Sequence, residues 1–308
     1  MKPRFTLLLA LSVLISGCTS PAESTAIPSA IQPASTTETS SPLEAPPATE
    51  MPVSTATSLP AKEIWLPPLD STFSWQLGSN DEINTNFDVD IYDLDAFETE
   101  ASLIASLHSQ GKKVICYISV GSWEDWRPDA ADFPSEIIGN DYEGWPGEKW
   151  LDIRQIDLLA PIMRARLDMC VKKGFDGIEP DNIDLHWADT GFKISYEDQL
   201  AYNIWLSEEA HARGLSIGLK NDDEQVSDLL PYFDWALTED CFIGEWCQEM
   251  LPFIEAGKPV FAAEYTDQIS LEDFENIICP PANDLNFHVF LKNRNLDEFR
   301  ADCPVNAE

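Results

Sequence analysis

Basic side chains are scarce in this chain of 308 residues, which carries 19 lysines and arginines against 54 aspartates and glutamates. The resulting formal charge of −35 at neutral pH repels a phosphate backbone and argues against nucleic acid as a partner. A cationic substrate would be attracted by the same charge, although an acidic surface also keeps an exported protein soluble.

Several motifs of common enzyme classes are missing as well. The four histidines, at positions 108, 186, 211 and 288, are scattered, and no Cys-x-x-Cys pair or Cys/His spacing indicates zinc. The chain also lacks a Ser/His/Asp arrangement, a phosphate-binding glycine loop and a nicotinamide fingerprint. We therefore predict neither a metal nor a cofactor.

The first 17 residues have the pattern of a secretory signal peptide. Lys2 and Arg4 precede an apolar run over residues 5–17, which is too short to span a bilayer comfortably. Residues 14–18 (Leu-Ile-Ser-Gly-Cys) resemble the bacterial lipobox, whose cysteine is acylated and becomes the new N-terminus. We predict an exported protein that is lipid-anchored through Cys18 to the outer face of a bacterial membrane, with ordinary secretion as the alternative.

Residues 18–62 read as a lipidated, disordered tether, because 32 of the 43 residues over 19–61 are Ser, Thr, Pro or Ala. Residues 63–308 are long enough for one α/β barrel domain. Without the tether and signal residues, 16 basic and 50 acidic side chains remain, a net charge of −34. We expect a monomer that meets a membrane only through its lipid.

Four times along the domain a helical stretch ends in glycine and a short apolar strand follows, at Gly111, Gly174, Gly214 and Gly257. Glycine suits the position after a helix because it accepts positive φ at little cost. Helix alternating with strand indicates βαβ crossovers in a parallel sheet. We predict an α/β fold, a (β/α)₈ TIM barrel, whose chemistry lies at the C-terminal ends of the strands.

Nine segments have the composition of strands, and eight would close a barrel. They are residues 73–77, 87–92, 114–119, 150–153, 177–180, 216–220, 233–238, 260–264 and, as a ninth, 287–291. Between two of them, Ser195 and Asp198 resemble a capping box at the start of a helix that ends before Gly214.

Acids dominate the residues at the predicted strand ends. Carboxylates gathered with aromatic and amide side chains fit the cleavage of glycosidic bonds, in which one carboxylic acid protonates the leaving oxygen and another attacks or activates water. Tryptophans in predicted loops, among them Trp126, Trp145 and Trp187, offer flat faces for sugar rings.

A series of motifs over residues 64–266 resembles glycoside hydrolase family 114, the endo-α-1,4-polygalactosaminidases. The motifs are Trp75-Gln76-Leu77, Val114 to Ser119, Trp126 to Asp129, Pro146 to Arg154, Asp176 to Asp184, Gly218 to Asp222 and Glu239-Asp240-Cys241. The resemblance implies a barrel enzyme that cuts within α-1,4-linked galactosamine polymers. The free amines of these polymers are charged, so the expected partner is a cationic amino-sugar polysaccharide. It also implies that Asp181 and Glu239 are the catalytic carboxylates. Where this chain has Thr238 and Asp240, the family commonly has Asn and Gln.

Further residues at the strand ends are expected to bind substrate. They are Gln76, Asp93, Tyr117, Asp152, Glu179, Asn182, Asp184, Lys220, Asn221, Asp222, Glu264 and Tyr265. Two have alternative readings: Glu179 as a buried acid paired with Lys220 or Arg154, and Asp184 as a helix N-cap.

Two other functions stay open at this point. One is hydrolysis of another polysaccharide on the same scaffold, and the other is carbohydrate binding without catalysis. The strands of Asp181 and Glu239 are separated by one strand, a spacing that favours a retaining mechanism.

Six cysteines remain besides Cys18, an even number in an oxidising compartment. We favour the disulfides Cys241–Cys247 and Cys279–Cys303. For Cys116 and Cys170, each on an apolar face, buried free thiols are equally consistent with the sequence.

Overall fold

The computed structural model describes residues 63–78 and 82–304. The predicted signal peptide, the predicted acylation site at Cys18 and the predicted tether therefore lie outside the described residues. In the described part of the chain, no helix is both long enough and apolar enough to cross a membrane.

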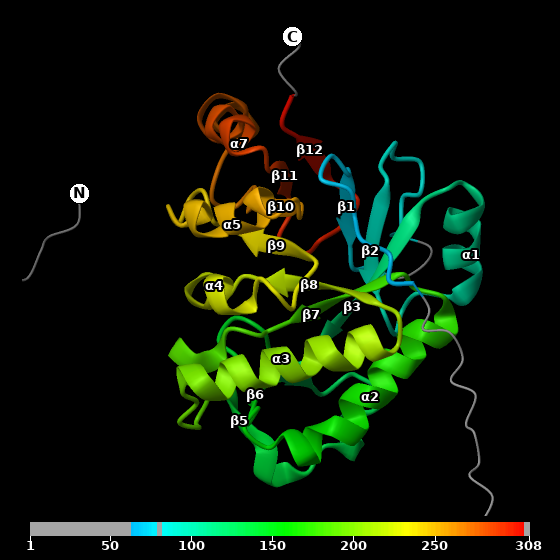
Figure 1. The fold of residues 1–308 in the computed structure, drawn as a ribbon, viewed down its shortest axis with the longest axis vertical. Coiled ribbons are helices and arrows are strands. Elements are labelled where there is room, and N and C mark those ends of the chain that lie inside the picture. Colours follow the sequence, from blue (N-terminus) through cyan, green and yellow to red (C-terminus); the bar gives the residue numbers. More distant parts are fainter. Residues whose placement is uncertain (1–62, 79–81, 305–308) are drawn as a thin grey trace, which may run out of the picture. The chain divides into compact units, whose positions relative to one another are not determined.

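Eight parallel strands wrap into a nearly closed barrel, with helices on the outside (Figure 1). In spatial order they are β1 (Phe73–Gln76), β2 (Ile91–Asp95), β3 (Lys113–Ser119), β7 (Gly177–Asp181), β8 (Ser216–Lys220), β9 (Trp235–Glu239), β10 (Val260–Tyr265) and β11 (His288–Lys292). A short strand, β12 (Arg300–Asp302), pairs antiparallel with β11 at the edge of the sheet. The predicted TIM-type barrel is confirmed.

One predicted barrel strand is wrong. Residues 150–153 overlap β6 (Glu148–Leu151), which lies in a separate antiparallel sheet with β4 (Ser122–Glu124) and β5 (Ile138–Asp141). β3 pairs directly with β7, so no residue between these two strands contributes a strand to the barrel sheet. The predicted ninth strand supplies β11 and completes the set of eight. Alternation of apolar and polar residues cannot distinguish a strand of such an insertion from a barrel strand.

Helices connect the strands on the outside of the barrel. They are α1 (Ala101–Ser109), α2 (Ile156–Lys173), α3 (Tyr196–Ala212), α4 (Val226–Leu229), α5 (Leu251–Glu255), α6 (Leu271–Asp273), the π-helical turn η7 (Phe274–Ile278) and α7 (Cys279–Leu285). Short 3₁₀ turns are η2 (Ala130–Asp132), η3 (Ser135–Ile137), η4 (Leu185–Trp187), η5 (Asp223–Gln225) and η6 (Cys247–Met250). Each predicted helix-ending glycine has a positive φ, between 73° at Gly214 and 103° at Gly174. The capping box of Ser195 and Asp198 starts α3 as predicted.

The barrel interior is filled by aromatic side chains. Phe73 stacks on Phe261 with ring centroids 4.3 Å apart, and Phe290 and Trp235 pack against the same group. A second apolar layer lies between the sheet and the helices. Because the interior is closed by packing, polar side chains at the strand ends face a cavity above an apolar floor.

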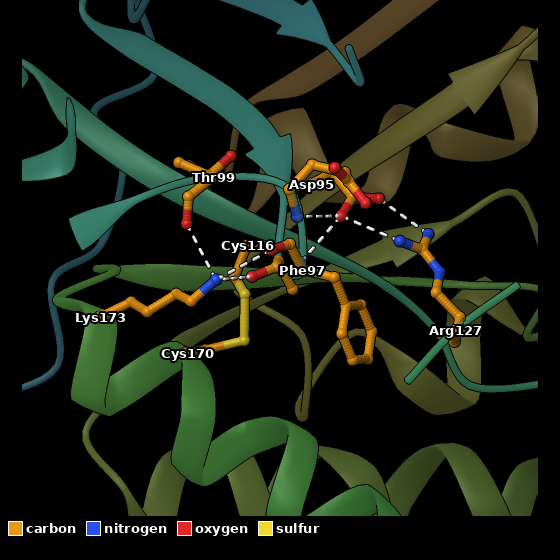
Figure 2. The surroundings of a disulfide bond; sticks show 9 residues. Asp95, Phe97, Thr99, Cys116, Arg127, Cys170 and Lys173 are labelled. Carbon is orange, nitrogen blue, oxygen red and sulfur yellow. Dashed lines mark hydrogen bonds and ion pairs between the residues drawn. A yellow bond between two sulfur atoms is a disulfide. The ribbon is translucent and has the colours of Figure 1, made fainter. Parts of the chain in front are cut away.

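A disulfide between Cys116 and Cys170 joins β3 to α2. From the sequence, two buried free thiols were an equally consistent alternative. Figure 2 shows Lys173, also on α2, reaching the loop that follows β2. Its ammonium donates to the backbone carbonyls of Ala96 at 2.6 Å and Thr99 at 2.9 Å. These links fix α2 against two neighbouring barrel strands.

The structure also contains both disulfides that the sequence favours, Cys241–Cys247 and Cys279–Cys303. The first joins the loop after β9, in which Cys241 follows Glu239 by two residues, to the start of η6. The second joins the start of α7 to the end of β12. Each therefore restrains a segment beyond a barrel strand rather than the barrel itself.

Candidate active site

A cavity of about 1090 Å³ opens among the C-terminal ends of the barrel strands and the β4–β6–β5 sheet. Twelve carboxylates line it: Asp95, Glu98, Glu124, Asp141, Glu143, Glu148, Asp181, Asp184, Asp189, Asp223, Glu239 and Asp240. The cations among its lining residues are Arg127, Lys220 and Arg294. The cavity therefore has a strongly negative electrostatic potential, which attracts cations.

Lys220, at the end of β8, is the centre of this site. Its Nζ lies 2.9 Å from Glu179 Oε1, 2.8 Å from Asp181 Oδ1 and 3.3 Å from Glu239 Oε2. The ammonium also lies 4.7 Å from the ring centroid of Trp75. Burial lowers the pKa of Lys220, but the three carboxylates outweigh it and raise that pKa well above its usual value. Lys220 is thus a permanent cation between the carboxylates.

Asp181 follows the buried part of β7 and reaches the cavity wall. Its Oδ2 accepts a hydrogen bond from the Tyr117 hydroxyl at 2.9 Å, while Asn182 Nδ2 lies 3.4 Å away. With Lys220 on the other oxygen, both Asp181 oxygens have donors, and 19% of the side chain stays exposed. Donors of this kind stabilise the carboxylate charge and fix its direction.

Glu239, at the end of β9, is held in a similar way. The Tyr265 hydroxyl donates to Glu239 Oε1 in a short hydrogen bond, and Asn221 Nδ2 lies 3.4 Å from Oε2. The side-chain oxygen of Asn221 in turn accepts from the Glu239 backbone N–H at 2.9 Å. Since 28% of the Glu239 side chain is exposed, its carboxylate is positioned firmly yet faces the cavity.

The shared ammonium fixes how far apart these two carboxylates are. Lys220 Nζ is 2.8 Å from Asp181 Oδ1 and 3.3 Å from Glu239 Oε2, so these two oxygens lie no more than 6.1 Å apart, the sum of the two distances. Carboxyl groups about 5 to 5.5 Å apart are typical of retaining glycosidases, and about 6.5 to 9.5 Å of inverting ones.

Comparison with known proteins agrees with this carboxylate-lined barrel. The sequence profile of Glycoside-hydrolase family GH114 matches residues 54–308. The chain belongs to family GH114. It is a glycoside hydrolase, as the sequence motifs predict.

Solved structures and a curated relative of this GH114 chain were also found. The crystal structure of Aspergillus fumigatus Ega3 in complex with galactosamine is 36% identical, covers 79% of this chain and 98% of its own, and has a TM-score of 0.74. The glycoside hydrolase domain of PelA from Pseudomonas aeruginosa is 16% identical, covers 76% and 98%, and superposes with a TM-score of 0.60, a likeness of fold. A protein of Deinococcus radiodurans is 25% identical over 207 residues, 59% of this chain and 65%, less than two thirds, of that relative.

Eight of the residues predicted for the GH114 site line the cavity. They are Tyr117, Asp181, Asn182, Asp184, Lys220, Asn221, Glu239 and Tyr265. Asp184 occupies the N-cap position of η4, as its alternative reading predicts, but its side chain makes no capping hydrogen bond there. Burial, followed by the charge of Asp181, raises the pKa of Asp184 to about 7.

Six predicted residues do not line the cavity. Gln76 binds the backbone of Asn84, with its Oε1 2.9 Å from the amide nitrogen. Asp152 directly follows β6 of the separate antiparallel sheet, and its Oδ1 lies 2.6 Å from Arg154 Nε. In both cases the polar groups are used within the fold.

The other four lie beneath or behind the site. Asp222 accepts from Asn203 at 2.8 Å, and burial raises its pKa to about 9. Glu264 accepts from the backbone N–H of Phe242 at 2.9 Å, in the loop that follows Glu239. Glu179 pairs with Lys220, as its alternative reading anticipated, and Asp93 is buried beside it. Sequence position at a strand end does not reveal which of these acids reaches the cavity.

The β4–β6–β5 sheet also supplies residues to the cavity that were not predicted from the sequence, above all Glu148. This side chain is 7% exposed, accepts from the Ser122 hydroxyl and lines the cavity. Burial raises the pKa of Glu148 to about 7. Glu148 lies inside one of the quoted family motifs, so the signal was present, but assigning that motif to a barrel strand directed attention to Asp152.

Proposed function

We propose that this GH114 hydrolase cleaves within polysaccharides of α-1,4-linked galactosamine, with Asp181 and Glu239 as its catalytic carboxylates. The observation that carries the proposal is the contact of Lys220 with both acids on the wall of an acid-lined cavity. The relative Ega3, whose structure was solved with galactosamine, supports the choice of sugar.

The cavity lining suits an amino sugar in particular. A galactosamine residue carries an ammonium group, and carboxylates such as Asp181, Glu239 and Glu143 on the cavity wall can accept charge-assisted hydrogen bonds from such groups. Trp126, Trp145 and Trp187 also line the cavity and are 51%, 47% and 70% exposed, so their rings are free to stack on sugar faces. A neutral N-acetylated polymer would use the tryptophans but not the charge.

The distance between the two carboxylates favours retention of configuration. One carboxylate attacks the anomeric carbon and forms a glycosyl-enzyme ester, while the other carboxyl group gives its proton to the departing glycosidic oxygen. In the second step that group takes a proton from water, whose oxygen displaces the ester and restores both residues. Lys220 stays charged throughout and holds the two groups in place.

The test compares two polymers and three proteins. Full-chain protein is incubated with α-1,4-linked polygalactosamine and with the fully N-acetylated polymer, and the products are analysed by mass spectrometry. We expect internal cleavage of the free-amine polymer, and losses of at least about a thousandfold in kcat for Asp181→Asn and Glu239→Gln. An α-anomer formed first indicates retention. Near wild-type turnover by either variant contradicts the assignment of that residue, and preference for the acetylated polymer contradicts the substrate.

A further inference from the structure

Two carboxyl groups are buried together under the floor of the site. Asp93 on β2 and Glu179 on β7 are both 0% exposed, and their strands flank β3. Within the described residues, both oxygens of Asp93 and Oε2 of Glu179 are buried and accept no hydrogen bond from another group. The remaining oxygen, Glu179 Oε1, accepts from Lys220 at 2.9 Å.

Two ionised carboxylates in such a place would be very unfavourable. The side chains of Asp93 and Glu179 lie within hydrogen-bonding reach of each other. Neighbouring buried carboxylates resolve their repulsion by sharing a proton, which turns one of them into a donor. That proton supplies the donor that the buried oxygens otherwise lack.

The surrounding charges decide which residue keeps the proton. Lys220 contacts Glu179 directly and favours its ionised form, while Asp181 and the hydroxyl of Tyr117 lie on the cavity side. Burial, and then the charge of Glu179, raise the pKa of Asp93 well above its usual value. Burial raises the pKa of Glu179 to about 7, with Lys220 acting against it. The proton therefore belongs on Asp93.

We propose that Asp93 is a positioning residue that stays protonated, donates to Glu179 and leaves a single negative charge beneath Lys220. This inference rests on the proposed function, because Lys220 matters to catalysis through Asp181 and Glu239. A second charge below Lys220 would compete with Glu239, whose contact of 3.3 Å is the longest of the three. Loss of the Asp93 proton at alkaline pH would loosen the catalytic pair.

An infrared measurement tests the proton without any substrate. In full-chain protein at neutral pH, the difference spectrum of wild type minus Asp93→Asn should contain the carbonyl stretch of a protonated carboxylic acid. The matched control is Asp88→Asn, which changes a fully exposed carboxylate just before β2, the strand of Asp93. This variant should show no such band. A carboxylate band alone in the Asp93→Asn difference spectrum overturns the proposal.

Stability gives a second readout that is independent of activity. An aspartate whose pKa is higher in the folded than in the unfolded protein contributes its full stabilisation below its unfolded-state pKa of about 3.9. This stabilisation is lost as the pH rises towards its pKa in the folded protein. Asn does not titrate. Relative to Asp93→Asn, the unfolding constant of wild type should therefore rise with pH from about pH 4 upward, with a limiting slope of about tenfold per pH unit. A constant ratio across this range means that Asp93 is ionised in the folded protein.

Turnover then separates positioning from mere space filling. Asp93→Asn keeps a neutral donor, so kcat should stay within about threefold of wild type and the decline at alkaline pH should move higher. Asp93→Leu keeps the branched shape but removes the donor, and kcat should fall at least about tenfold with KM little changed. Equal activity of the Leu and Asn variants overturns the positioning role. If wild type cleaves no amino-sugar polymer, the proposed function fails, while the spectroscopic and stability results still decide the proton.

Discussion

Glu148 and Asp181 share one hydrogen-bond donor: Nδ2 of Asn182 lies 3.4 Å from Glu148 Oε1 and 3.4 Å from Asp181 Oδ2. Asn182 has a φ of 61°, a backbone conformation that asparagine tolerates better than most residues. A carboxylate from the antiparallel sheet is thereby placed beside Asp181, one of the two proposed catalytic carboxylates of the barrel. In that position it can bind the ammonium of the sugar that is being cleaved.

The variant Glu148→Gln should weaken binding of the free-amine polymer. A charge-assisted hydrogen bond contributes about 1.5–3 kcal/mol, so KM should rise about ten- to a hundredfold. The pKa of Glu148 is raised to about 7, so the carboxylate is neutral below that pH and ionised above it. In wild type, KM should fall as pH rises through about 7, and this dependence should be lost in Glu148→Gln.

Steady-state kinetics between pH 5 and 8 measure both effects, with Glu143→Gln as the control. Glu143 also lines the cavity from the same insertion but is exposed. It should change KM much less, because an exposed charge pair contributes only about 0.2–1 kcal/mol. If the two variants behave alike, Glu148 has no special part in binding the amine.

Replacing Lys220 by methionine should damage both activity and stability. The change removes the ammonium and leaves Glu179 buried with an unpaired oxygen beside Asp181 and Glu239. Breaking a buried ion pair from one side costs about 3–5 kcal/mol, and kcat should fall by at least about a hundredfold.

Chemical denaturation and polymer cleavage measure the two losses for Lys220→Met. The matched control is Lys258→Met, a half-buried lysine whose Nζ donates to backbone carbonyls of Leu230 and Phe233 and which does not line the cavity. This control should lose stability but keep kcat. A Lys220→Met enzyme with full kcat would show that Lys220 does not hold the catalytic pair.

Sequence could predict the barrel because its signals are local. A glycine with positive φ follows each of the four predicted helix ends. Each of the eight barrel strands overlaps one of the nine predicted segments, although β2 shares only residues 91 and 92 with the segment predicted over 87–92. The barrel strand assigned to residues 150–153 was wrong because β3 pairs directly with β7, a non-local fact. That single error replaced Glu148 with Asp152 among the expected site residues.

Depth within the site was also beyond the sequence. Glu179 and Asp181 are two residues apart on β7, yet one is fully buried and the other is 19% exposed. Both side chains point inward, since alternate residues of a strand face the same side. Glu179 lies two residues closer to the packed aromatic interior than Asp181. Asp181 therefore reaches the cavity, whereas Glu179 contacts Lys220 from the buried side.

Membrane attachment is a separate proposal, carried by the sequence at Cys18 alone. In a bacterial host, Cys18→Ser should move the protein from the membrane fraction to the soluble exported fraction, because acyl chains provide the stable anchor. Fractionation followed by immunoblotting measures the shift, and mass spectrometry of the wild type should show acyl groups on Cys18. An unchanged membrane fraction, or an unacylated Cys18, contradicts the lipid anchor.

The disulfide between Cys116 and Cys170 should stabilise the fold without affecting catalysis. It closes a loop with a sequence separation of 54, against 24 for Cys279–Cys303, and chain entropy assigns about 4 and about 3.5 kcal/mol to loops of these lengths. Neither pair lines the cavity.

The double variants Cys116→Ala/Cys170→Ala and Cys279→Ala/Cys303→Ala should both unfold at a lower denaturant concentration than wild type, and the first of them at the lowest concentration. Both should cleave polymer at the wild-type rate below their unfolding transitions. A loss of kcat in the first variant would mean that α2, through Lys173 and the loop after β2, also shapes the cavity wall at Asp95.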